Sequence, residues 1–234
     1  MKKSGLREWV PGARKTRPAV RLRPQTASAI LKALSFYLIL SGSSVYAGGQ
    51  VYTPLSASVR AVLQHSVSDQ AAPKLAFSSQ SEANAWLTDM SRRLEKRLPD
   101  TKYRTDFLYT VHYEATRAGL DPQLVLGLIE VESGFKKYAV SSVGARGYMQ
   151  VMPFWVNEIG TQEQNLFHLR TNLRYGCTIL RHYLDRENGD LFRALGRYNG
   201  SLGRPEYPNL VRAAWHGHWL LPSRSVNQGY LPAS

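Results

Sequence analysis

Helix signals dominate the sequence from Ser79 onward, and signals for β-strands are nearly absent there. Ser79 and Glu82 have the spacing of a capping box, and apolar residues follow them at helical intervals. Asp121 and Pro122 fit the N-cap and the first position of a later helix. Further helices are expected over residues 105–118, 147–158, 172–187, 190–198 and 208–219. The pattern predicts an all-α fold, with one helical domain over residues 80–222.

Two shorter segments flank this expected domain. Residues 48–79 are rich in Ser, Ala and Gln and are expected to form a linker. Within it, Leu55, Val59, Val62 and Leu63 could make one short amphipathic helix. Residues 223–234 are expected to form a C-terminal tail.

Much of the positive charge lies near the N-terminus. Residues 1–47 contain nine Lys and Arg residues and one Glu, so they carry +8 of the formal net charge of +13. This basic segment runs into an apolar stretch and then into small residues that end in Val45 and Ala47, which is the pattern of a secretory signal peptide. We therefore expect residues 1–47 to be cleaved after Ala47 and the protein to be exported to the periplasm. An uncleaved anchor, which would attach the protein to the membrane, is the alternative.

The remaining composition excludes several classes of protein. The charge left after residue 47 is only +5, which supports a nucleic-acid-binding function poorly. The single cysteine, Cys177, excludes a disulfide framework, and its place on an apolar helix face predicts a buried thiol. His216 and His218 are two residues apart, so on a helix they point in different directions and are expected to be surface or interface residues. We expect neither a metal nor a cofactor.

Two carboxylates lie near the end of the helix that follows Pro122. Glu130 and Glu132 are two residues apart, so they point about 200° apart on a helix and cannot act as a pair. Glu130 shares its face with Gly127, which predicts a solvated or packing face, whereas Glu132 shares the apolar stripe. Burial would raise the pKa of Glu132 and keep it protonated near neutrality, as a general acid requires. On these features alone, an ordinary glutamate at a helix end is the simpler interpretation.

The residues around Glu132 change that interpretation. They form four ordered blocks: Glu132-Ser-Gly-Phe135; Ala139-Val-Ser141 with Gly144-Ala-Arg-Gly147-Tyr-Met-Gln-Val-Met-Pro153; Asn172 with Gly176; and Tyr198-Asn-Gly200. In sequence and spacing these blocks resemble the soluble lytic transglycosylase (SLT-type) domain, a peptidoglycan-cleaving family. The resemblance covers residues 107–215 and implies a goose-lysozyme-like helical fold.

The resemblance also implies roles for individual residues. Glu132 would be the catalytic acid and base, with Ser133 supporting the end of its helix. Four residues would bind substrate or face the sugar groove: Ser141, Gln150, Met152 and Tyr198. Of these, Tyr198 would also hydrogen-bond and orient the catalytic carboxyl. Asn172 and Asn199 would have structural, supporting roles.

Three positions depart from the family pattern. Tyr148 replaces the usual Leu, and it can still be a core residue. Trp155 stands where Thr is usual, so it is a candidate aromatic platform for a sugar. Arg197-Tyr-Asn-Gly-Ser201 replaces Ala-Tyr-Asn-Ala-Gly, which changes the surroundings of Tyr198.

The function implied by the resemblance is non-hydrolytic cleavage of the MurNAc–GlcNAc β-1,4 bond of peptidoglycan. Glu132 would act first as acid and then as base, and the product would carry a 1,6-anhydro-MurNAc end. Two alternatives remain at this point: a hydrolytic, lysozyme-like muramidase, and a weakly active peptidoglycan-binding scaffold. The expected partner is the glycan strand, and an envelope-spanning secretion or conjugation complex is a further one.

Overall fold

The computed structural model describes residues 49–68, 71, 74–161 and 163–221. The expected signal peptide with its cleavage point, and the expected C-terminal tail, lie outside these residues. Within them the chain is helical, without strands, so the all-α prediction is confirmed. The helices are α2 (Ala57–Ser68), α3 (Gln80–Leu94), α4 (Thr101–Arg117), α5 (Pro122–Ser133), α6 (Phe154–Ile159), α7 (Leu169–Arg186), α8 (Leu191–Asn199) and α9 (Glu206–Ala214), followed by the π-helix η1 (Trp215–Trp219). None of these helices has the length and apolar character needed to cross a membrane.

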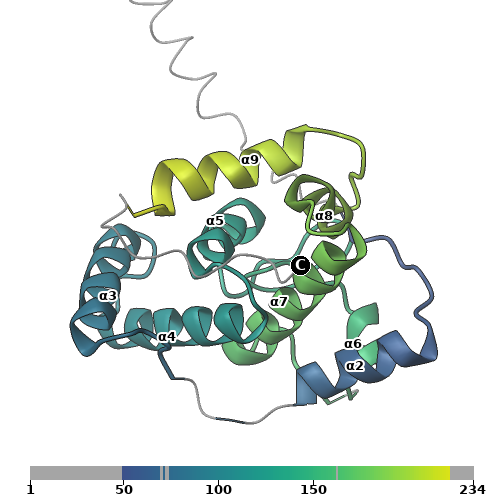
Figure 1. The fold of residues 1–234 in the computed structure, drawn as a ribbon, viewed down its shortest axis with the longest axis horizontal. Coiled ribbons are helices and arrows are strands. Elements are labelled where there is room, and N and C mark those ends of the chain that lie inside the picture. The colour runs from purple at the N-terminus through teal and green to yellow at the C-terminus, as the bar shows by residue number, and fades with distance from the viewer. Residues whose placement is uncertain (1–48, 69–70, 72–73, 162, 222–234) are drawn as a thin grey trace, which may run out of the picture. The chain divides into compact units, whose positions relative to one another are not determined.

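Helix α5 is the most buried element of the domain. Its residues from Leu124 to Ile129 are all buried, and such a helix needs neighbours on every side. Helix α5 packs against α4, α9 and η1, and Figure 1 shows it between α4 and α9. At Gly127 a Cβ atom would lie 2.8 Å from the backbone nitrogen of Trp215, so the absence of a side chain allows η1 to approach. The face that Gly127 shares with Glu130 is therefore a packing face.

The caps expected from the sequence are formed. The side chain of Ser79 accepts a hydrogen bond from the backbone N–H of Glu82 at 3.2 Å, and Glu82 accepts in turn from the N–H of Ser78, one residue before the usual partner. The carboxylate of Asp121 accepts from the N–H of Gln123 at 2.7 Å. These bonds satisfy amide groups that have no partner within their helices, and so they fix where α3 and α5 begin.

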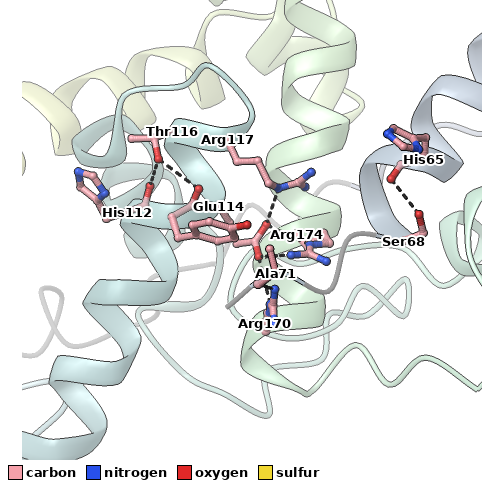
Figure 2. Close-up of polar contacts among 10 residues, drawn as sticks. His65, Ser68, Ala71, His112, Glu114, Thr116, Arg117, Arg170 and Arg174 are labelled. Carbon is pink, nitrogen blue, oxygen red and sulfur yellow. Dashed lines mark hydrogen bonds and ion pairs between the residues drawn. The ribbon is translucent and has the colours of Figure 1, made fainter. Parts of the chain in front are cut away.

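A buried carboxylate joins α4 to α7. Glu114 of α4 is fully buried and accepts two hydrogen bonds from Arg174 of α7, at 3.1 and 2.8 Å. Arg117 donates to the same carboxylate at 3.2 Å, and Arg170 lies 3.5 Å from it (Figure 2). Because a buried charge is costly unless it is paired, this cluster makes α4 and α7 depend on each other.

The predicted helix over residues 147–158 is wrong in its first half. Gly147 and Gln150 have positive φ angles of 76° and 47°, which no right-handed helix contains. Arg146 instead forms isolated antiparallel bridges with Val140 and with Val151. The helical signal of this motif belongs only to α6, which begins after Pro153.

The segment expected to be a linker contributes to the core. Its predicted short helix is α2, which packs against α6 and α7. Leu63 and Val67 of α2 are buried in the same apolar cluster as the residues of α5 and α7. We therefore propose that the folded domain includes residues from at least 49 onward, and its outer boundaries remain a prediction.

Candidate active site

Glu132 lies in the last turn of α5 and is only 2% exposed. Gly134, with a φ of 56°, ends the helix in the left-handed conformation that glycine adopts readily. The hydroxyl of Ser133 donates to the carbonyl of Ile129 at 3.2 Å, inside the same turn. Ser133 is thus tied to the turn that presents Glu132, and its supporting role stays a prediction.

The surroundings of Glu132 favour its protonated form. Burial raises its pKa from the usual 4.5 to about 8, and a hydrogen bond from the Tyr207 hydroxyl partly offsets this shift. That hydroxyl donates to Oε1 at 2.5 Å, whereas Oε2 is buried with no hydrogen-bond partner among the described residues. A proton carried on Oε2 is thus available for transfer, because no protein acceptor holds it.

The hydrogen bond expected from Tyr198 to Glu132 is not formed. The Tyr198 hydroxyl donates to the backbone carbonyl of Met149 at 2.7 Å, and Tyr207 takes the place beside the carboxyl. Helix α9, which carries Tyr207, packs directly against α5 and so brings this hydroxyl to Glu132. Tyr198 is still near enough for the charge of Glu132 to raise its pKa further, in addition to the effect of burial.

The loop between α5 and α6 contains the other predicted groove residues. The side-chain amide of Gln150 donates to the carbonyls of Ala139 and Gly147, at 3.1 and 2.9 Å, and Gln150 is only 3% exposed. The Ser141 hydroxyl accepts from the N–H of Ala145 at 3.0 Å. Gln150 and Ser141 therefore hold the shape of this loop, and their contact with a glycan remains a prediction.

Met152 lies at the end of the same loop and is half-buried. Its backbone N–H donates to the side-chain carbonyl oxygen of Gln50 at 3.2 Å. Gln50 belongs to the segment expected to be a linker, and no pattern in the sequence places it near the site.

Asn172, in α7, holds the backbone of the α5–α6 loop through its side-chain amide. Its amide accepts from the N–H of Met149 at 2.8 Å and donates to the carbonyls of Arg146 and Leu166. These three bonds to backbone groups support the structural role expected for Asn172. Asn199 is also buried, at 4% exposure, at the end of α8.

The three departures from the family pattern have different outcomes. Trp155 is 3% exposed and packs against Tyr183, so the expectation of an exposed sugar platform is wrong. Tyr148 is a core residue whose hydroxyl lies 2.6 Å from that of Tyr103. Arg197 forms an ion pair with Glu187.

His218 and Cys177 are the residues here that bear on metal or redox chemistry. The Nδ1 atom of His218 lies 3.0 Å from Oε2 of Glu130, which also accepts from the indole N–H of Trp219. No group of three potential metal ligands occurs among the residues whose positions are described. Cys177 is fully buried, as predicted, and its burial raises the pKa of the thiol.

Sequence reasoning missed two residues that contact the predicted site residues, Tyr207 and Gln50. Tyr207 lies beside Pro208 in the first turn of α9, and nothing in its spacing distinguishes it from other tyrosines. Gln50 lies in a polar segment without an apolar pattern. Long-range packing places both side chains, so no local signal in the sequence identifies them.

Comparison with known proteins shows which proteins this part of the chain resembles. Residues 110–208, which include Glu132 and Tyr207, match the family model of the transglycosylase SLT domain. A transglycosylase of Enterobacteria phage PRD1 is 34% identical over 98 residues, which are 42% of this chain and 36% of the phage protein.

Two bacterial relatives carry the name membrane-bound lytic murein transglycosylase C. The protein of Actinobacillus pleuropneumoniae serotype 5b (strain L20) is 51% identical over 47 residues, which are 20% of this chain and 13% of the relative. The protein of Histophilus somni (strain 2336) is 32% identical over 113 residues, covering 42% of this chain and 31% of the relative. The chain thus spans about a third or less of the length of these proteins. Together with the helical fold and the buried Glu132, the match shows that residues 110–208 are similar to the transglycosylase SLT domain.

Proposed function

We propose that this protein is a lytic transglycosylase that cleaves the MurNAc–GlcNAc bond of peptidoglycan. The observation that carries the proposal is the state of Glu132: a buried carboxyl with a pKa of about 8, held by Tyr207 through one oxygen and unpartnered at the other. Such a carboxyl is protonated at neutral pH and is oriented for proton transfer. The names of the relatives support murein as the substrate.

The proposed mechanism uses Glu132 twice. Its Oε2 proton passes to the glycosidic oxygen, and the bond to the anomeric carbon of MurNAc breaks. The acetamide oxygen of MurNAc then bonds to that carbon, so that no carboxylate nucleophile is required. Glu132, now a carboxylate, takes the proton of the muramyl 6-hydroxyl, whose oxygen displaces the acetamide and closes the 1,6-anhydro ring.

One feature of the site favours a lyase over a two-carboxylate hydrolase. Glycosidases that use two carboxylates hold them about 5 to 9.5 Å apart. The hydrogen-bond partner that the described residues give Glu132 is the Tyr207 hydroxyl and not a carboxylate. A single acid and base is what the intramolecular closure of the anhydro ring requires.

We further propose that the protein acts on the wall after export to the periplasm. The N-terminal pattern of basic, apolar and small residues supports export. Glycan strands are the proposed partner, and an envelope-spanning secretion or conjugation complex is a proposed site of action.

The decisive test is digestion of purified peptidoglycan by the protein and its Glu132→Gln variant. The wild type is expected to release muropeptides that are lighter by one water than the hydrolysed forms, and Glu132→Gln is expected to fold and release none. The matched control is Glu130→Gln, two residues away on the same helix, which should retain activity. Muropeptides of hydrolysed mass would instead identify a muramidase. Binding to peptidoglycan without cleavage would identify a scaffold.

A further inference from the structure

A single buried side chain interrupts the exposed segment before α2. Val51 and Tyr52 are 63% and 50% exposed, whereas Gln50 is only 5% exposed. The carboxamide oxygen of Gln50 accepts the N–H of Met152 at 3.2 Å, and the Gln50 side chain is also a hydrogen-bond partner of Tyr198. Gln50 therefore inserts between two of the four residues expected to bind substrate.

The backbone of Gly49, next to Gln50, lies close both to the α5–α6 loop and to the end of α8. A Cβ atom on Gly49 would lie 3.0 Å from a methyl group of Val143 and 3.7 Å from the sulfur of Met152. On the other flank, a Cβ atom on Gly200 would lie 2.2 Å from the carbonyl oxygen of Gly49. The segment thus crosses from the α5–α6 loop to the end of α8, and only glycine at position 200 leaves room for it.

Tyr52 attaches the far end of the segment to α6. Its hydroxyl donates to Glu158 at 3.1 Å, and its ring packs edge-on against Phe154. Arg60 of α2 binds the other oxygen of Glu158 at 3.0 Å. These exposed and half-buried contacts hold the segment in place weakly, because polar contacts near water contribute little stability.

The chemistry of Gln50 suggests what it replaces. A carboxamide offers the same carbonyl acceptor and amide donor as the acetamido group of an N-acetylated sugar. We propose that residues 49–52 form a strap that occupies the sugar groove in the free protein, with Gln50 in the place of a substrate acetamide. The groove is located by the proposed function, on which this inference rests. The strap competes with the glycan, and the glycan must displace it before reaching Glu132.

A reversible cross-link tests the strap. In the ideal geometry a Cβ atom on Gly49 lies 3.6 Å from the Cβ of Val143, close to the spacing of about 3.8 Å in disulfides. The double variant Gly49→Cys with Val143→Cys should therefore form a disulfide in the folded full chain. Cys177 is fully buried and does not compete. Release of muropeptides is measured before and after reduction, with the two single-cysteine variants as controls.

The outcomes separate the strap from the proposed function. We expect the oxidised double variant to lose most of its activity and to recover it on reduction, while the single variants stay active. If the cross-linked protein is as active as the reduced one, residues 49–52 are a fixed wall of the site and the strap is wrong. Failure of the two thiols to pair also contradicts it. A wild type that does not cleave peptidoglycan, by contrast, contradicts the function itself.

A second variant measures the competition without a cross-link. Gln50→Ala removes the hydrogen bonds to Met152 and Tyr198, and their loss should raise the fraction of open protein by about fivefold or more. The KM for peptidoglycan should fall by about the same factor, with kcat unchanged. Thr53→Ala, at an exposed position three residues further on, is the control. A rise in KM would show that Gln50 helps to bind the substrate, which would overturn the inference.

Discussion

At the scale of single residues, the site depends on two opposing influences on the pKa of Glu132, one from burial and one from Tyr207. Burial raises the pKa of Glu132, and the Tyr207 hydroxyl lowers it by stabilising the carboxylate. The first influence supplies an acid at neutral pH, and the second makes its conjugate base accessible for the second half of the reaction. Both steps of the proposed mechanism thus need the pair.

Tyr207→Phe should change both the rate and its pH dependence. Loss of the hydroxyl removes a bond that stabilises the carboxylate, so the pKa of Glu132 should rise above about 8 and the alkaline limit of activity should move to higher pH. We expect kcat to fall by about tenfold or more, because the carboxyl is no longer oriented.

The measurement is a pH–rate profile for release of muropeptides. Tyr148→Phe is the matched control, since it removes a buried hydroxyl that bonds to Tyr103 and not to Glu132. An unchanged alkaline limit in Tyr207→Phe would contradict the assignment.

Glu132 should also make the stability of the fold depend on pH. Its pKa is about 8 in the folded protein against a usual 4.5, so between these values the native state holds a proton that the unfolded chain has released. The free energy of unfolding should therefore fall by up to about 1.4 kcal/mol per pH unit as the pH rises through this range.

Glu132→Gln removes this dependence, so its stability relative to the wild type should increase from pH 5 to pH 8. Urea denaturation of both proteins at the two pH values measures the difference. Comparison at equal pH cancels other titrating groups, such as His112, whose pKa burial lowers to about 4. A constant difference between the proteins would show that Glu132 is not buried as described.

The sequence predicted the chemistry of this site better than its geometry. Glu132 could be found because its apolar helix face and its flanking motif are both local in the chain. Tyr207 could not, because its contact with Glu132 depends on the packing of α9 against α5. The same reason explains why Tyr198, which lies within the motif, was expected to make the bond that Tyr207 forms.

At the scale of elements, the buried carboxylate of Glu114 links α4 to α7. Glu114→Gln leaves three arginines around a neutral group. One of them, Arg174, is only 4% exposed. We expect a loss of about 3–5 kcal/mol in the free energy of unfolding, because the buried Arg174 loses the carboxylate that accepts two of its hydrogen bonds.

Chemical denaturation measures this loss. Asp185→Asn is the matched control, because it also removes an acid from an arginine pair but at a side chain that is 63% exposed. The control should change stability by less than about 1 kcal/mol. Equal effects of the two substitutions would contradict the role given to Glu114.

The elements themselves were largely predictable, with one exception. Helices α3, α5, α7 and α8 carry caps or apolar periodicity that the sequence shows directly. Residues 147–153 have a similar composition but form a loop, because Gly147 and Gln150 adopt positive φ angles and Asn172 binds the backbone between them. A tertiary contact from α7 decides this loop, and no local pattern shows it.

At the scale of the whole molecule, the packing of α2 makes Ala57–Ser68 part of the folded unit. Leu63 is 6% exposed, whereas its neighbour Val62 is 65% exposed. Leu63→Ala should therefore lower the free energy of unfolding by about 2–5 kcal/mol, and Val62→Ala should change it little. Thermal or urea unfolding of the pair measures this. If both substitutions are neutral, α2 does not belong to the cooperative fold.

The buried thiol of Cys177 can report how often the helical core opens. The chain has one cysteine, and it is fully buried in the middle of α7. A thiol reagent added to the native protein can react only when the helical core opens, so the labelling rate follows the frequency of that opening. Labelling in the presence and absence of a bound glycan would then report, without denaturant or an engineered cysteine, how strongly the substrate holds the whole domain closed.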